Sequence, residues 1–168
     1  NSTEAQRIVD SVLTGHVSPD YYLLKAEIAE FENNKKAKIS AMESFWKLAN
    51  NPAYGKMYNT YKIEAFAEDA ATKKEALVLA EEEIKNRATP ETYHLLALAN
   101  LVNGNKEIAL EIIKQHVVDK TFEPTALLTM AKIYKANRMP DKVKDLKEEL
   151  LEAEYELGPL KLREIIAL

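Results

Sequence analysis

The feature that most constrains this chain is a recurring proline. Five of its six prolines stand at nearly regular intervals, at Pro19, Pro52, Pro90, Pro124 and Pro159. Proline is favoured in the first turn of a helix, where its missing N–H would have no intrahelical partner. The regular spacing therefore predicts one helical unit that starts again several times, as in a repeat architecture.

The clearest unit extends over residues 90–121. Apolar residues recur at helical spacing over 93–102 and again over 108–116. Between these runs, residues 103–105 read Asn-Gly-Asn, and glycine readily adopts the positive φ that ends a helix. The unit is therefore predicted to be a pair of helices joined by a tight turn.

The same pattern returns one period later, where Ala131 takes the place of Ala97 and Pro140 begins the second helix. An earlier unit begins at Pro19 and has Ala26 at the corresponding position. A fourth unit, between these, matches more loosely over residues 56–80. The three alanines are predicted to be buried, because a small side chain lets the two helices of a unit approach closely.

The period and these positions resemble the tetratricopeptide repeat (TPR), whose pattern is W-x2-L-G-x2-Y, then A-x3-F, then P. The best unit reads Tyr93-x2-Leu96-Ala97-x2-Asn100, then Ala109-x3-Ile113, and the next reads Leu127-x2-Met130-Ala131-x2-Tyr134, then Val143-x3-Lys147. The chain departs from the family pattern at Asn100, where the family has tyrosine, at Lys147, where it has an aromatic residue, and at Glu64, near the small-residue position.

The resemblance implies an all-α fold, a right-handed α-solenoid of stacked antiparallel hairpins. About four repeats are expected, with a lone helix before them and a capping helix after them, in a single domain over 1–168 that is a fragment of a longer chain. The expected helices are 3–14, 20–32, 35–49, 54–69, 73–86, 90–102, 106–118, 123–136, 140–156 and 160–167.

The composition of the chain excludes or disfavours several classes of function. The chain has no cysteine and a net charge of -4, which excludes thiolate chemistry and disfavours a nucleic-acid surface. No apolar run approaches the ~18–20 residues of a membrane span, so no membrane insertion is expected. His16, His94 and His116 are better explained as structural or surface residues than as metal ligands. No carboxylate pair or nucleophile context appears, so we expect no catalysis, no cofactor and no metal.

The TPR resemblance implies that the first helices line a concave groove for a peptide or a partner helix. Its inward positions are expected at Leu23, Glu27, Glu30, Tyr58, Tyr61, His94, Leu98, Leu101, Leu128, Lys132 and Lys135. Such a groove is acidic at one end, aromatic and apolar in the middle and basic at the other end. Some TPR domains hold the C-terminal carboxylate of a peptide with a clamp of Lys, Asn and Arg. Leu23 and Glu27 stand where the first clamp residues would be, so that binding mode is disfavoured. Tyr61 and Leu98 are the expected anchors of a protein–protein interaction scaffold.

An alternative stays open. The segment could serve only as a structural or oligomerisation part of a larger protein, with no ligand of its own, and could self-associate through the N-terminal helix at 3–14. Residues 93–98 and 156–159 also resemble bacterial extracytoplasmic TPR proteins, which implies a periplasmic rather than a cytoplasmic location.

Overall fold

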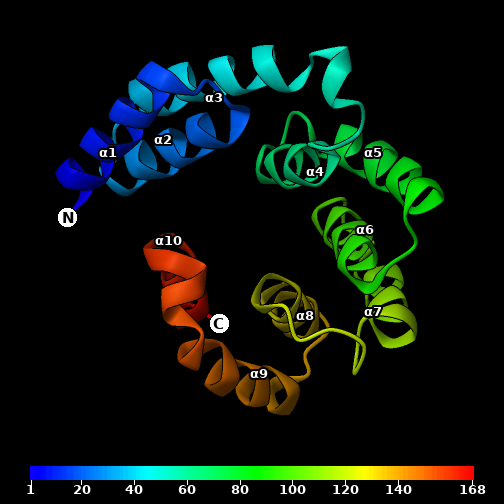
Figure 1. Ribbon diagram of the computed structural model, residues 1–168. Helices are drawn as coiled ribbons and strands as arrows, with labels where there is room; N and C mark the ends of the chain where they lie inside the picture. The colour runs from blue at the N-terminus through cyan, green and yellow to red at the C-terminus, as the bar shows by residue number, and fades with distance from the viewer. The chain divides into compact units, whose positions relative to one another are not determined.

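The computed structural model describes all 168 residues and is all-helical, with ten α-helices, one short 3-10 helix and no strand (Figure 1). The chain divides into two compact units, residues 1–56 and 57–168, which are described separately below. None of the helices combines the length and the apolarity that a bilayer-spanning segment requires.

Unit 1 holds α1 (Ser2–Gly15), α2 (Pro19–Phe31), α3 (Lys35–Ala49) and the 3-10 helix η1 (Pro52–Tyr54). Pro19 occupies the first turn of α2, as its spacing predicts. The Asn34 side chain accepts a hydrogen bond from the Ala37 N–H and so caps α3. Helices α2 and α3 pack together as a hairpin, with α1 against α2, and Phe45 is the largest fully buried side chain of this unit.

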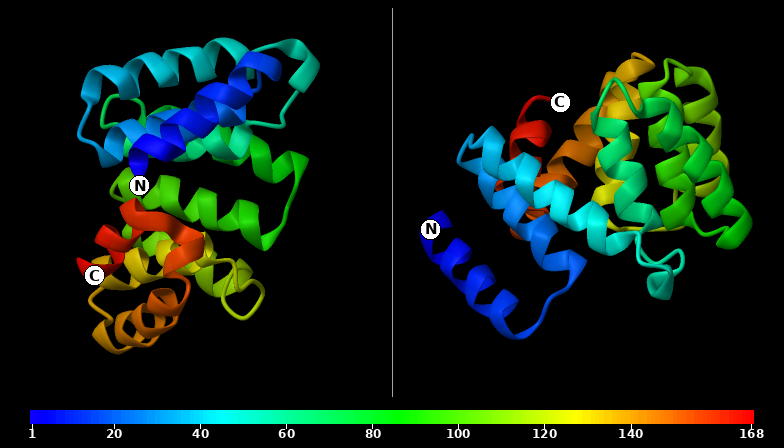
Figure 2. Two further views of the ribbon diagram at one scale, coloured as in Figure 1. Left: turned by 60° about the vertical axis from the view of Figure 1, so that its left-hand side comes forward. Right: turned by 90° about the horizontal axis from the view of Figure 1, so that it is seen from above.

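Unit 2 holds α4 (Asn59–Glu68), α5 (Lys73–Asn86), α6 (Pro90–Val102), α7 (Lys106–His116), α8 (Pro124–Ala136), α9 (Pro140–Glu152) and α10 (Glu154–Ile166). Three hairpins follow one another, α4–α5, α6–α7 and α8–α9, and the helices of the first two hairpins run side by side (Figure 2). The step along the chain from the start of α6 to the start of α8 equals the step from α7 to α9, which confirms the expected period in these two hairpins.

The core of unit 2 forms where the helices approach most closely. Ala97 and Ala131 are fully buried, which confirms their predicted role between paired helices. They belong to one apolar cluster that continues into α10 through Ile165. In the hairpin α6–α7, the rings of Tyr93 and His116 also stack with centroids 3.8 Å apart, so His116 has a packing role.

Two asparagines tie successive hairpins together in a way that the sequence pattern does not predict. Asn103, at the end of α6, donates its side-chain N–H both to the Ala99 carbonyl and to the Lys73 carbonyl at the start of α5. Asn137 does the same at the end of α8, reaching the carbonyl of Lys106 at the start of α7. The two asparagines are one period apart, so the repeat extends to the polar contacts between units.

Two helices are markedly shorter than expected. The helix expected at 54–69 begins only at Asn59, because Gly55 follows η1 with φ 54° and ψ -119°, a conformation that no helix contains. The helix expected at 140–156 ends at Glu152, where the Ala153 N–H bonds to the Leu150 carbonyl and tightens the last turn. The chain then enters α10, which is interrupted at Gly158.

Candidate functional site

The first helices of the three hairpins in unit 2 lie in contact in chain order, α4 against α6 and α6 against α8 (Figure 1). We call the surface that carries their predicted inward residues, from Tyr61 on α4 to Lys135 on α8, the first-helix face. Tyr61 is 44% exposed, and Leu98 and Leu101 on α6 are half-buried. These three side chains give the α4–α6 part of the face an aromatic and apolar character.

Three other predicted residues of unit 2 do not offer an open side chain. Tyr58, His94 and Leu128 are buried, with 3–5% of their surface exposed, so they contribute little surface of their own to this face. For Leu128 the reason is clear, because it belongs to the same apolar cluster as Ile165 of α10. Local helix periodicity could not reveal a covering helix that follows much later in the chain.

The predicted residues of unit 1 keep their expected positions on α2. Leu23 is half-buried, and Glu27 and Glu30 are exposed. Glu30 forms an ion pair with Lys38 of α3 at 2.6 Å. The carboxylate of Glu30 is therefore already balanced within its own hairpin.

The basic end of the first-helix face is occupied by the chain itself. Lys132 forms an ion pair with Glu164, and the Lys135 ammonium donates to the Ala167 carbonyl. Lys147 of α9 donates to the Ile166 carbonyl at 2.9 Å. Lysines at the C-terminal end of a helix satisfy carbonyls that have no intrahelical partner and interact favourably with the helix dipole.

Lys132 and Lys135 both contact α10 in this structure, so an external ligand would meet these two lysines only in place of those contacts. The contacts with α10 also explain the departure at Lys147, where the TPR pattern has an aromatic residue. The ammonium group of the lysine at that position donates a hydrogen bond to a carbonyl at the end of α10. An aromatic side chain has no ammonium group and could not make this contact.

The start of the same segment is held by a second group of charges. Lys161 lies 3.2 Å from Glu164 and 3.9 Å from Glu68 of α4. Burial alone would lower the pKa of Lys161, but the carboxylates of Glu164 and Glu68 outweigh it and raise the pKa. Burial would likewise raise the pKa of Glu164, but Lys132 and Lys161 hold it below its usual value. Lys161 and Glu164 are therefore both charged at neutral pH.

His94 is a buried imidazole on α6 whose Nδ1 has no hydrogen-bond partner. Burial lowers its pKa to about 4, although the nearby Glu91 carboxylate acts in the opposite direction. His94 is therefore neutral at pH 7, and its role in this structure is packing.

A polar network that the sequence pattern does not reveal lies between α4 and α5. Glu83 is fully buried and accepts hydrogen bonds from Asn59 and Arg87, both at 2.8 Å, and from Asn86 at 3.3 Å. Burial would raise the pKa of Glu83, but these donors hold it below its usual value. An acidic run such as Glu81-Glu82-Glu83 is typical of a solvated face, and only its third member departs from that interpretation.

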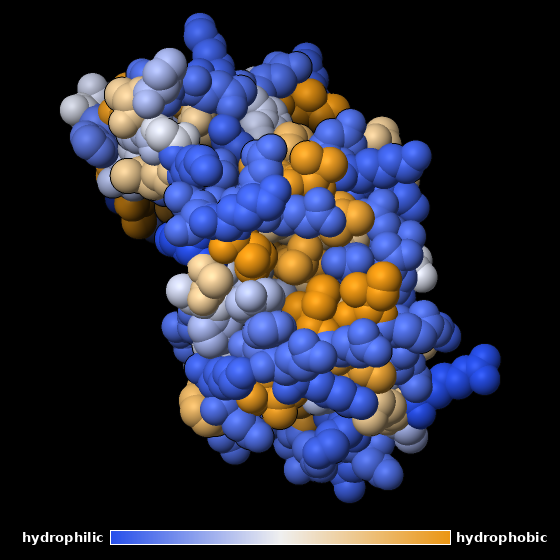
Figure 3. All heavy atoms as spheres, turned by 90° about the vertical axis from the view of Figure 1, so that its right-hand side faces the viewer, coloured by the Kyte–Doolittle hydropathy of each residue, from blue (hydrophilic) through white to orange (hydrophobic).

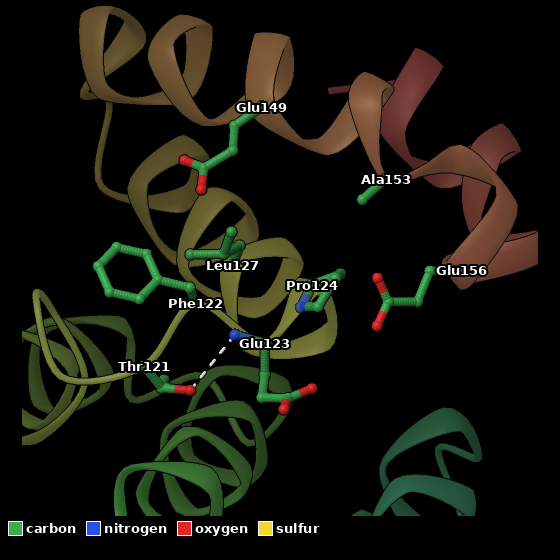
Figure 4. Close-up of a pocket in the computed structure, with 8 residues that line it drawn as sticks. All are labelled: Thr121, Phe122, Glu123, Pro124, Leu127, Glu149, Ala153 and Glu156. Carbon is green, nitrogen blue, oxygen red and sulfur yellow. Dashed lines mark hydrogen bonds between the residues drawn. The ribbon is translucent and has the colours of Figure 1, made fainter.

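A pocket of about 370 Å³ opens where the loop before α8 meets α9 and α10 (Figure 4). Glu123, Glu149 and Glu156 are among the residues that line it, together with Phe122, which is 75% exposed. The Thr121 hydroxyl oxygen accepts a hydrogen bond from the Glu123 N–H at 3.3 Å, which fixes the loop. The negative charge and the aromatic ring favour a cationic group.

A second surface lies along the second helices of unit 2, where apolar patches alternate with hydrophilic rows (Figure 3). Val78 of α5 and Ile108 of α7 are exposed there. A shallow pocket of about 390 Å³, lined by Phe66, Val78, Leu79 and charged residues, opens beside α5. This side offers scattered apolar contacts.

Comparison with known proteins returned no match: no family model, no curated protein and no solved structure shows significant similarity to the chain.

Proposed function

We propose that this protein is a TPR-like helical repeat scaffold that binds a peptide or a partner helix on its first-helix face, without catalysis. The observation that carries the proposal is that α4 lies against α6, while Tyr61 on α4 is 44% exposed and Leu98 and Leu101 on α6 are half-buried. A half-exposed tyrosine and leucines on neighbouring helices supply large contact area with a polar tip, which is typical of the centre of a binding surface.

Charge supports a direction for the bound segment. Glu64 and Glu68 lie at the α4 side of the face, and Lys132 and Lys135 lie on α8. A ligand with an apolar centre, a basic part toward α4 and an acidic part toward α8 matches this polarity. Such charges mainly set orientation and association rate, while the apolar contacts provide most of the affinity.

The proposal is tested by selecting peptides from a display library against the whole chain and measuring affinity by fluorescence anisotropy. Tyr61→Ala and Leu98→Ala should each weaken the selected peptide by about 1 kcal/mol or more, a fivefold change. Val78→Ala is the control, because it removes an exposed apolar side chain from the second-helix side. If Tyr61→Ala and Leu98→Ala both keep wild-type affinity, binding occurs away from the first-helix face and the proposal fails.

The second candidate function is self-association through α1. Ile8 is 50% exposed although α1 is amphipathic, and an exposed apolar residue on a terminal helix suits a contact between copies. Light scattering of the wild-type chain and of Ile8→Lys decides this candidate. A concentration-dependent dimer that Ile8→Lys abolishes supports it, and a monomer at all concentrations rejects it.

A further inference from the structure

The end of the chain forms a helical segment of its own within α10. Gly158 has φ 75° and ψ 174°, a conformation outside the helical region and strained for any side chain. Pro159 follows it and has no N–H to donate across the break. Residues 159–168 are therefore joined to the preceding turn through a single non-helical residue, Gly158.

This segment contacts α8 and α9 in the way that a separate ligand helix would. Ile165 is fully buried in the core cluster that contains Leu128, and Leu168 packs against that cluster. Glu164 pairs with Lys132, and the last carbonyls accept from Lys135 and Lys147. The opposite side of the segment remains exposed, including Ile166 and Ala167.

The charges on the two sides are unequal. Of the three lysines Lys132, Lys135 and Lys147, only Lys132 meets a carboxylate, that of Glu164, and Lys135 and Lys147 meet backbone carbonyls. The segment itself also carries Lys161 and Arg163. At its other end Lys161 lies 3.9 Å from Glu68. A helix with further carboxylates near its C-terminal end would therefore match the three lysines better than the segment that occupies them.

We propose that the surface of α8 and α9 beneath residues 159–168 is a helix-binding site, and that this segment is its resident occupant. The partner that replaces it is an amphipathic helix with two apolar residues three positions apart. This helix has a basic residue toward α4, and its carboxylates face Lys132, Lys135 and Lys147. This inference deepens the proposed function and rests on it, because it names the partner class for the α8 end of the first-helix face. Binding then requires release of the resident segment at Gly158.

The test uses a labelled probe peptide with the native sequence of residues 159–168, and full-length chains. In the Glu164→Lys chain the resident segment is repelled from Lys132, so the probe should bind at least tenfold more tightly than to wild type. Adding Lys132→Glu to that chain restores an ion pair between positions 132 and 164 in the resident segment's contact. The double variant should therefore lose the gain in affinity for the probe. Glu154→Lys, an equal charge reversal before the Gly158 break, is the matched control and should leave wild-type affinity.

Amide hydrogen exchange on the wild-type chain gives an independent measurement. Residues 159–168 should exchange at least tenfold faster than the buried amides of α8, because they open locally. Exchange at the rate of α8 would show a fixed part of the core and would overturn the proposal. If Glu164→Lys does not fold by circular dichroism, Glu164→Gln takes its place.

A folded variant that binds the probe no better than wild type also overturns the proposal. Peptides selected against the chain then separate this failure from a failure of the proposed function. Affinity that still depends on Tyr61 leaves the first-helix face as a binding surface without the α8 site, and affinity that depends on neither Tyr61 nor Leu98 rejects both proposals.

Discussion

Replacing Glu83 with alanine should destabilise the protein far more than any other change in its acidic run. The substitution removes the acceptor of three hydrogen bonds and leaves the buried amide of Asn59 without its partner. Arg87 is half-exposed, so its guanidinium regains water and that bond contributes less. A hydrogen bond to a charged group is worth about 1.5–3 kcal/mol, and a stranded buried donor adds about 1–3 kcal/mol. Relief of the buried carboxylate offsets part of this, which leaves about 2–4 kcal/mol.

Urea unfolding followed by far-UV circular dichroism measures this loss directly. With a slope of about 1–3 kcal/mol per molar urea, the midpoint should fall by roughly 1–2 M. Glu82→Ala is the matched control, because Glu82 is exposed on the same helix, and it should change stability by no more than about 0.5 kcal/mol. The reasoning is refuted if the two variants unfold at the same urea concentration.

A double-mutant cycle separates the hydrogen bond from the cavity. Asn59→Ala alone should also destabilise, and the double variant should lose less than the sum of the single losses, with a coupling of about 1–2 kcal/mol. Because the folded pKa of Glu83 lies below its usual value of 4.5, its contribution is present above pH 4.5 and is lost as the pH falls further. Glu83→Gln should flatten this acid dependence.

Three other changes test the structure at separate places. The pKa of His94 is about 4 in the folded protein against 6.5 when unfolded. The contribution of His94 to stability should therefore be complete above pH 6.5, and wild-type stability should be about 2 kcal/mol lower at pH 5. Urea titrations of wild type and of His94→Gln above pH 6.5 and at pH 5 measure this loss, which the variant should not show. Ala97→Leu should overpack the contact of α6 with α7 and cost roughly 1–3 kcal/mol by thermal unfolding, and a neutral result would contradict the assigned register. Trp46 is the single tryptophan and reports on the unfolding of unit 1, whereas circular dichroism reports on all the helices. Because each repeat is stabilised by its neighbours, the two unfolding transitions in urea should not coincide.

The sequence by itself determined the helical hairpins α6–α7 and α8–α9. Proline at a helix start, a turn at 103–105 and alanine at positions 97 and 131 act within one helix or one hairpin, so their spacing along the chain carries the information. The repeat period and these signals placed the helix starts of this half of the chain close to where the structure has them. Near Gly55 and Ala153 the same reasoning failed, since apolar periodicity continues there while the backbone turns.

Only the tertiary structure decided which of the predicted surface residues are available. Lys132, Lys135 and Leu128 are inward positions in the repeat register, but α10 covers or engages all three. Glu83 looks identical to Glu81 and Glu82 in the sequence, and it becomes a buried acceptor because Asn59, on the other helix of the hairpin, reaches it across the contact. Contacts of this kind depend on how helices return to one another in space, and helical periodicity specifies a residue's side of a helix without specifying what will cover it.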